Sequence, residues 1–190
     1  MSNEQTGIWI TGASSGIGKA AVEEFASVGC KIFATARRVT ELDRLKKEIN
    51  SKHLEIYPCN VASQANVEQI FKKITSENQI NCLVNNAGIT SFKTAEDNTI
   101  KEIDDIIKTN LLGSIYTLKS TLAHMKKMGG GMMLQQPISR PSLWLMHRLL
   151  PLSSRMIFYP NMMPLSTRRH QSRIKHRFRQ LDPRLMPASR

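Results

Sequence analysis

The segment Thr11–Gly18 constrains this chain most, because it places three glycines between an apolar run and a stretch of good helix formers. The run Ile8–Thr11 is continuously apolar up to its last residue, which is typical of a strand buried on both faces. Helix-favouring residues follow from Lys19 to Ala26, and Lys31–Ala36 is the next apolar run. A strand, a glycine turn, a helix and a second strand make a βαβ unit.

Each glycine of this turn has its own expected role. Gly12 lets the chain leave the strand sharply, Gly16 keeps a side chain away from an approaching pyrophosphate, and Gly18 lets the helix pack closely on the sheet. The free N–H groups and positive dipole at the start of the helix attract phosphate. An ordinary tight turn is the alternative, but the position between a strand and a helix favours a phosphate site.

Two further motifs follow in the chain. Cys82–Asn85 reads as a short buried strand that leads into Asn86-Ala87-Gly88, and Asn110-Leu-Leu-Gly113 lies in a helical stretch after Thr99. With Gly-x-x-x-Gly-x-Gly, these motifs resemble the classical short-chain dehydrogenase/reductase family over the N-terminal two thirds of the chain. The resemblance implies NAD(P)-dependent hydride transfer between the cofactor and a small carbonyl or alcohol substrate. It implies cofactor contacts at Gly12, Ser14, Ser15, Gly16, Ile17, Gly18, Asn60, Val61, Asn86, Ala87 and Gly88.

Strands and helices continue to alternate between these motifs. Helices are expected over Glu41–Asn50 and Asn66–Glu77, with a strand at Leu54–Pro58 between them. This alternation predicts an α/β, Rossmann-like, doubly wound parallel sheet within residues 1–131. We expect the sheet to be truncated after its fourth strand and the long helix that follows. Met132–Gln136 leads into Pro137 and Pro141, and proline cannot donate to a strand ladder.

The end of the second expected strand bears on cofactor choice. An NAD site places an acidic side chain near this end, whereas Arg37 and Arg38 stand here. Two guanidinium groups can hold a 2′-phosphate, which predicts NADP over NAD. The alternative is a solvated loop edge. Ser14 and Ser15 are expected to meet phosphate or ribose, to cap the helix, or both.

The family resemblance also defines what the catalytic site needs. Its members use a Ser, a Tyr with a Lys four residues later, and an Asn within a helix. Only the Asn is matched, by Asn110, for which a polar residue that kinks its helix is the alternative interpretation. The three tyrosines are followed four residues later by Val61, Ser120 and Met163. Losing general acid–base catalysis costs about 10²–10⁴ in rate.

The amino-acid usage changes after Gly131. Residues 1–131 hold 10 Gly, 6 Val, 11 Ala and 14 acidic residues, whereas residues 132–190 hold one Ala, one Asp and no Gly, Val or Glu. All these residue types have codons that begin with G, so their joint loss indicates a changed reading frame. In a shifted frame, the codons of residues 161–166 can encode Tyr-Asp-Ala-Ser-Lys. We therefore expect residues 132–190 to be a poorly packed Pro-, Met- and Arg-rich tail.

Charge and cysteine content suggest the setting in which the chain works. The net charge is +12, and residues 132–190 carry 11 basic groups and one acidic group. Two alternative functions therefore remain beside the oxidoreductase. One is a remnant that binds a dinucleotide without catalysis. The other, which is less favoured, is binding of the basic tail to nucleic acid or to acidic surfaces. Three cysteines without metal-ligand spacing, a polar N-terminus and the lack of a long apolar run predict a cytoplasmic protein without a metal or a membrane span. The family resemblance also implies that the chain can associate with itself into a homo-oligomer.

Overall fold

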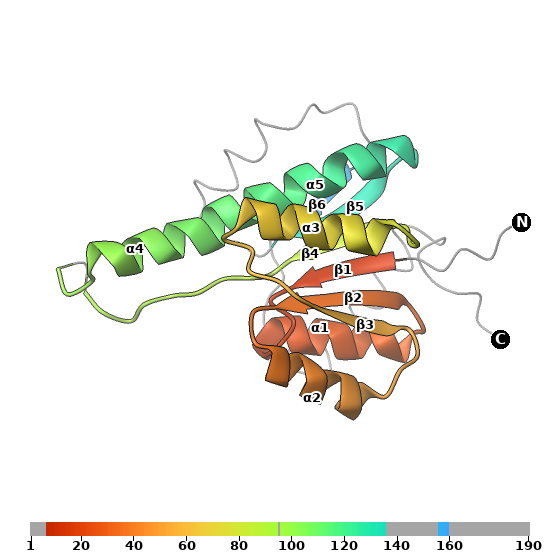
Figure 1. The fold of residues 1–190 in the computed structure, drawn as a ribbon, viewed down its shortest axis with the longest axis horizontal. Helices are drawn as coiled ribbons and strands as arrows, with labels where there is room; N and C mark the ends of the chain where they lie inside the picture. Colours follow the sequence, from red (N-terminus) through yellow and green to blue (C-terminus); the bar gives the residue numbers. More distant parts are fainter. Residues whose placement is uncertain (1–6, 95, 136–155, 160–190) are drawn as a thin grey trace, which may run out of the picture.

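The computed structural model describes residues 7–94, 96–135 and 156–159, which form a parallel sheet flanked by helices (Figure 1). The sheet has six strands in the order β3-β2-β1-β4-β5-β6, and every neighbouring pair is parallel. The strands are β1 (Gly7–Thr11), β2 (Lys31–Ala36), β3 (Leu54–Pro58), β4 (Cys82–Asn85), β5 (Gly131–Gln135) and β6 (Met156–Tyr159). The predicted Rossmann-like class is therefore confirmed, and the strand order reverses between β1 and β4.

The helices cover both faces of the sheet, with α1 and α2 on one side and α3 and α5 on the other (Figure 1). They are α1 (Gly16–Ser27), α2 (Val39–Ile49), α3 (Gln64–Thr75), α4 (Ile100–Ile106), the π-helical segment η1 (Ile107–Leu112) and α5 (Gly113–Lys127). None of the helices in the described ranges is both long and apolar enough to cross a lipid bilayer.

The apolar run in strand β1 is unbroken because both faces of this strand are buried. Successive side chains of a strand point to opposite faces. Ile8 and Ile10 pack in the core beneath α1 and α2, whereas Trp9 packs with Phe33 in the core beneath α3 and α5. All five residues of β1 are buried, so the strand forms the centre of both cores.

The expected truncation after the fourth strand is wrong. β5 pairs with β4 from Cys82↔Met132 to Asn85↔Gln135, and β6 pairs with β5. The prolines at 137 and 141 follow β5, so they remove no donor from it. Met132, Met133 and Leu134 are buried on the two cores, which covers the edge that β4 would otherwise expose. The boundary placed at residue 131 thus falls inside β5, and most of the predicted basic tail lies outside the described residues.

Helix α4 stands apart from the layered body and extends from it together with the segment that precedes it (Figure 1). None of its seven residues is buried. Its start is held by a capping box, in which the Thr99 hydroxyl accepts from the backbone N–H of Glu102 and the Glu102 carboxylate accepts from the N–H of Thr99. The helix therefore depends on local hydrogen bonds more than on packing.

Candidate functional site

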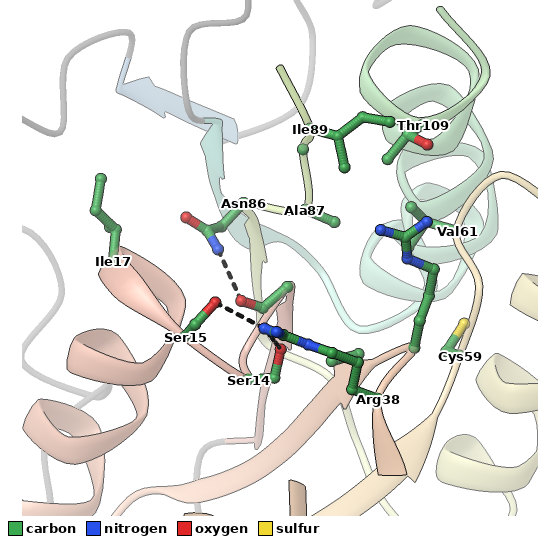
Figure 2. Close-up of a pocket in the computed structure, with 14 residues that line it drawn as sticks. Ser14, Ser15, Ile17, Arg38, Cys59, Val61, Asn86, Ala87, Ile89 and Thr109 are labelled. Carbon is green, nitrogen blue, oxygen red and sulfur yellow. Dashed lines mark hydrogen bonds between the residues drawn. The ribbon is translucent and has the colours of Figure 1, made fainter. Parts of the chain in front are cut away.

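A cavity of about 480 Å³ lies at the carboxyl ends of the strands, where the strand order reverses (Figure 2). This is the place where open parallel sheets bind their ligands. Ten of the residues predicted to bind cofactor line it: Gly12, Ser14, Ser15, Ile17, Arg37, Arg38, Val61, Asn86, Ala87 and Gly88. Residues from four separate strand ends thus meet in one cavity.

Four further lining residues were not predicted: Ala36, Cys59, Ile89 and Thr109. Ala36 ends β2 and Cys59 follows β3, so their position at strand ends was the signal that could have identified them. Ile89 and Thr109 come from the segment after β4 and from η1, and no local motif marks them. They reach the cavity only because these two segments pack together.

The three glycines of the turn after β1 differ in what surrounds them. Gly12 and Gly16 have positive φ angles of 65° and 55°, which favour glycine. A Cβ added to Gly16 would stand in open space, whereas a Cβ on Gly18 would collide with the carbonyl oxygen of Gly12 and the amide nitrogen of Asn86. Gly16 and Gly18 do not line the cavity, and Gly18 allows the start of α1 to approach the turn itself.

Hydrogen bonds join the turn after β1 to the turn after β4. The Thr11 hydroxyl accepts from the backbone N–H groups of Asn86 and Ala87, each at 3.0 Å. The Asn86 side-chain amide donates to the carbonyl oxygens of Thr11 at 3.1 Å and Gly12 at 3.2 Å, the second of which Figure 2 shows. The side chain of Asn86 therefore holds the two turns together, and Asn86 is also one of the residues that line the cavity.

The N-terminus of α1 makes the cavity positive beside the turn that follows β1. The first N–H groups of any α-helix have no partner within the helix, and the helix dipole adds partial positive charge there. The first turn of α1 contains no acidic residue, and Ser15 at its N-cap makes no side-chain capping bond. The capping role that was the alternative for Ser15 is thus not seen.

The two predicted arginines lie at the mouth of the cavity. The Arg38 guanidinium donates to the hydroxyl oxygens of Ser14 at 3.2 Å and Ser15 at 3.1 Å (Figure 2). Arg37 is exposed and lines the same cavity. Of the described residues that line it, none is acidic. The mouth therefore presents two cations to an incoming anion.

Asn60 and Val61, which follow β3, differ in position. Val61 is buried and lines the cavity, whereas Asn60 is exposed and does not. The side-chain oxygen of Asn60 accepts from the backbone N–H of Ala62 at 3.1 Å. Asn60 thus shapes the local turn that presents Val61.

Asn110, the predicted catalytic residue, lies beside the cavity rather than in its wall. Its side-chain oxygen accepts from the backbone N–H of Ile89 and its side-chain nitrogen donates to the Ile89 carbonyl, each at 2.8 Å. It belongs to η1, so the helix is irregular at this residue. Its neighbour Thr109 is buried and lines the cavity. At the other end of the motif, a Cβ on Gly113 would come within 2.8 Å of Val61 Cγ2.

The titratable groups of the described cavity wall are Arg37, Arg38 and Cys59. Burial raises the pKa of the Cys59 thiol to about 11, so this thiol is neutral at pH 7. Tyr57 is outside the wall, and its hydroxyl donates to the Glu55 carboxylate at 2.5 Å. Burial and this carboxylate raise the pKa of Tyr57 well above its usual value. The described wall thus contains no side chain suited to donate a proton to a substrate at neutral pH.

Known proteins are similar to this chain both in sequence and in fold. The family model for short chain dehydrogenase matches residues 6–135. Dehydrogenase/reductase SDR family member 7 of Homo sapiens is 30% identical over 125 residues, which cover 62% of this chain and 37% of that protein. The chain spans about half or less of the length of the curated relatives it matches.

Two solved structures are also similar to this chain in their three-dimensional fold. The alcohol dehydrogenase of Thermococcus sibiricus, complexed with 5-hydroxy-NADP, has a TM-score of 0.64 at 32% identity, covering 70% of this chain and 58% of that chain. A metagenomic short-chain oxidoreductase in complex with NADP has a TM-score of 0.66 at 25% identity, covering 70% and 62%. Because the family model matches residues 6–135, more than half of the chain, the chain belongs to the short chain dehydrogenase family.

Proposed function

We propose that the cavity binds a nicotinamide dinucleotide and prefers NADP(H) to NAD(H). One observation carries this proposal: the cavity joins the positive start of α1 at the glycine turn to the two arginines at the end of β2. A dinucleotide needs both features, because its pyrophosphate suits a helix N-terminus and its adenosine ribose reaches the end of the second strand. Two similar structures are titled as complexes with NADP or 5-hydroxy-NADP, which supports the proposal.

The preference for NADP(H) follows from the charges at the cavity mouth. A 2′-phosphate on the ribose can accept charge-assisted hydrogen bonds from Arg37 and from Arg38, which Ser14 and Ser15 already hold in place. Each such bond contributes about 1.5–3 kcal/mol. NAD(H) would need a carboxylate for its ribose hydroxyls, and the described wall offers none.

Binding measurements with NADPH and NADH test this proposal. Arg37→Asp is expected to weaken NADPH binding by about tenfold or more, with a much smaller effect on NADH. Arg44→Asp is the matched control, because Arg44 is exposed on α2, pairs with Glu48 and does not line the cavity. Equal losses for both cofactors, or an equal effect of the control, would contradict the proposal.

The proposed reaction is that of an NADP(H)-dependent oxidoreductase acting on a small carbonyl or alcohol compound. The cofactor, when bound, supplies or accepts the hydride. Within the chain, the backbone around Gly12–Gly18 and the arginines would hold the cofactor, while Ile89 and Thr109 enclose it on the side of η1.

A second candidate is a chain that binds the dinucleotide without turnover. The 190 residues contain no Tyr-x-x-x-Lys, and the described cavity wall has no proton donor suited to neutral pH. Purified protein mixed with NADPH and a panel of carbonyl compounds separates the two candidates. Loss of NADPH absorbance establishes turnover, whereas binding without that loss supports the second candidate. A salt-sensitive complex with DNA would instead favour the basic tail as the functional part.

The proposal also includes a cytoplasmic location and self-association of the chain. Cys30, Cys59 and Cys82 are all buried and none of them is in a disulfide, as expected for a protein of the reducing cytoplasm. Self-association is supported by α4 and η1, where Ile100, Ile103 and Ile107 leave 76%, 37% and 46% of their surface exposed. A second copy of the chain could bury this stripe.

A further inference from the structure

We infer that Gly113 is a positioning residue that fixes the place of Val61 and thereby sets the width of the cavity beside β3, where the base of the cofactor would lie. This inference rests on the proposed function, since it needs a cofactor that carries an adenine base. Gly113 is the first residue of α5 and is buried, and it is not among the residues of the described cavity wall.

The order of the strands shows where the base would lie. The proposed function places the pyrophosphate at the start of α1 and the ribose at the end of β2, and β3 is the next strand beyond β2. A base attached to this ribose comes beside the residues that follow β3, which are Cys59 and Val61 in the cavity wall. Ile89 and Thr109 complete this part of the wall (Figure 2). The walls are largely apolar, as suits a flat purine ring.

The backbone at Gly113 does not itself require glycine. Its φ and ψ angles are −58° and −42°, which are those of an ordinary right-handed helix. Alanine is a better helix former than glycine at such angles. The reason for a glycine at this position therefore lies in its surroundings.

The space beside Gly113 is occupied by Val61. A Cβ added to Gly113 would lie 2.8 Å from Val61 Cγ2, and 3.1 Å from both Val61 Cβ and the Val61 carbonyl oxygen. Rotation of the valine side chain cannot relieve all three contacts, because two of them involve its Cβ and its backbone. The segment that carries Val61 would therefore have to move away from α5.

The free space next to Val61 is the cavity. Only 5% of the surface of Val61 is exposed, and Val61 lies between the helix formed by η1 and α5 and the cavity that it lines (Figure 2). Packed protein interiors contain few other voids. A side chain at Gly113 would thus push Val61 into the cavity and leave less room for the base, whereas glycine lets α5 lie close behind Val61.

The test measures dissociation constants of NADP and of etheno-NADP, whose adenine carries an extra fused ring. Gly113→Ala should weaken NADP binding roughly five- to fiftyfold, because it narrows the cavity. It should weaken etheno-NADP binding further, since the larger base needs more width. Val61→Ala alone should favour etheno-NADP relative to NADP. Gly113→Ala combined with Val61→Ala removes the closest contact, so it should bind NADP within about threefold of Val61→Ala alone.

Gly131→Ala is the matched control. Its added Cβ would lie 2.5 Å from Met125 Sδ, so this glycine is also closely approached, but it begins β5 and does not line the cavity. It should lower the free energy of unfolding without changing the affinity for either ligand. If Gly113→Ala alone does not fold, as judged by circular dichroism, the double variant and Val61→Ala carry the comparison.

The outcomes separate this inference from the function on which it rests. Failure of the folded wild-type chain to bind NADP overturns both. An unchanged NADP affinity of folded Gly113→Ala, or a loss that the added Val61→Ala does not reverse, overturns the role of Gly113 alone. An equal loss in Gly131→Ala also overturns it, because the effect would then come from lower stability. Equal discrimination between the two ligands by the wild-type chain and Val61→Ala overturns it without any variant at Gly113.

Discussion

The side-chain amide of Asn110 pairs with both backbone groups of Ile89: it accepts from the N–H and donates to the carbonyl, each at 2.8 Å. The pair joins η1 to the segment that follows β4, across 21 residues of sequence. Ile89 lines the cavity, so the residue predicted to be catalytic has a visible structural task. Any part it has in a reaction would come in addition to this task.

Replacing Asn110 by Ala should therefore destabilise the chain and loosen one cavity wall. Two lost hydrogen bonds predict a decrease of roughly 1–3 kcal/mol in the free energy of unfolding, measured with urea. NADPH affinity should fall as well. Asn78→Ala is the control, since it loses one bond to the Ile74 carbonyl on α3, away from the cavity. A loss no larger than that of Asn78→Ala would contradict the prediction.

Alanine at Gly16 and alanine at Gly18 should both destabilise the chain, but for different physical reasons. Gly18→Ala forces a Cβ against the Gly12 carbonyl and the Asn86 amide, which predicts a loss of about 1–3 kcal/mol in unfolding free energy. Gly16→Ala meets no atom within 4 Å, so its stability cost is the backbone strain of a φ near 55°, about 1–2 kcal/mol.

Cofactor titration distinguishes the two glycine variants further. The added methyl group of Gly16→Ala stands in open space outside the described cavity wall, where it would obstruct a pyrophosphate that approaches the glycine turn, so it should reduce NADPH affinity by about tenfold or more. Retention of wild-type affinity by folded Gly16→Ala would show that the phosphate lies elsewhere.

His124 predicts a pH dependence of stability. Its Nε2 accepts from the backbone N–H of Ile80 at 3.1 Å, which requires neutral imidazole. Burial first, and then the charge of Lys127, lower the pKa of His124 in the folded chain. The unfolded chain binds this proton more readily, so the contribution is complete above about pH 6.5 and is lost as pH falls from there through the lower pKa of the folded chain.

Urea titrations between pH 8 and pH 5 test this dependence. The wild-type free energy of unfolding should fall over this range more steeply than that of His124→Phe, which cannot titrate at this position. His53→Phe is the control for a second histidine, since His53 has no comparable bond from a buried backbone N–H. Parallel pH profiles for wild type and His124→Phe would refute the assignment.

The exposed isoleucines of α4 and η1 predict self-association. Ile103→Ser combined with Ile107→Ser should convert an oligomer of the wild-type chain into a monomer, as measured by light scattering during gel filtration. Val39→Ser, which changes an apolar residue of 48% exposure on α2, should leave the mass unchanged. A monomeric wild-type chain would contradict this prediction directly.

Elements with strong local patterns were predictable from sequence. The expected strands at Lys31–Ala36, Leu54–Pro58 and Cys82–Asn85 match the observed bounds, because apolar runs ended by turn residues allow few alternatives. The glycine turn and the arginines after β2 were equally readable, since their chemistry depends on position along one short segment. Strand β5 was missed because its two methionines and the prolines beyond it gave no local strand signal.

The sequence by itself thus determined the βα alternation, the glycine turn and the cations that follow β2. Only the tertiary structure decided that β5 extends the sheet and that Ile89 and Thr109 close the cavity. The physical reason is the range of the interactions. A turn or a helix start is stabilised by neighbours in sequence, whereas strand pairing and the cavity walls need groups that approach each other only after the chain has folded.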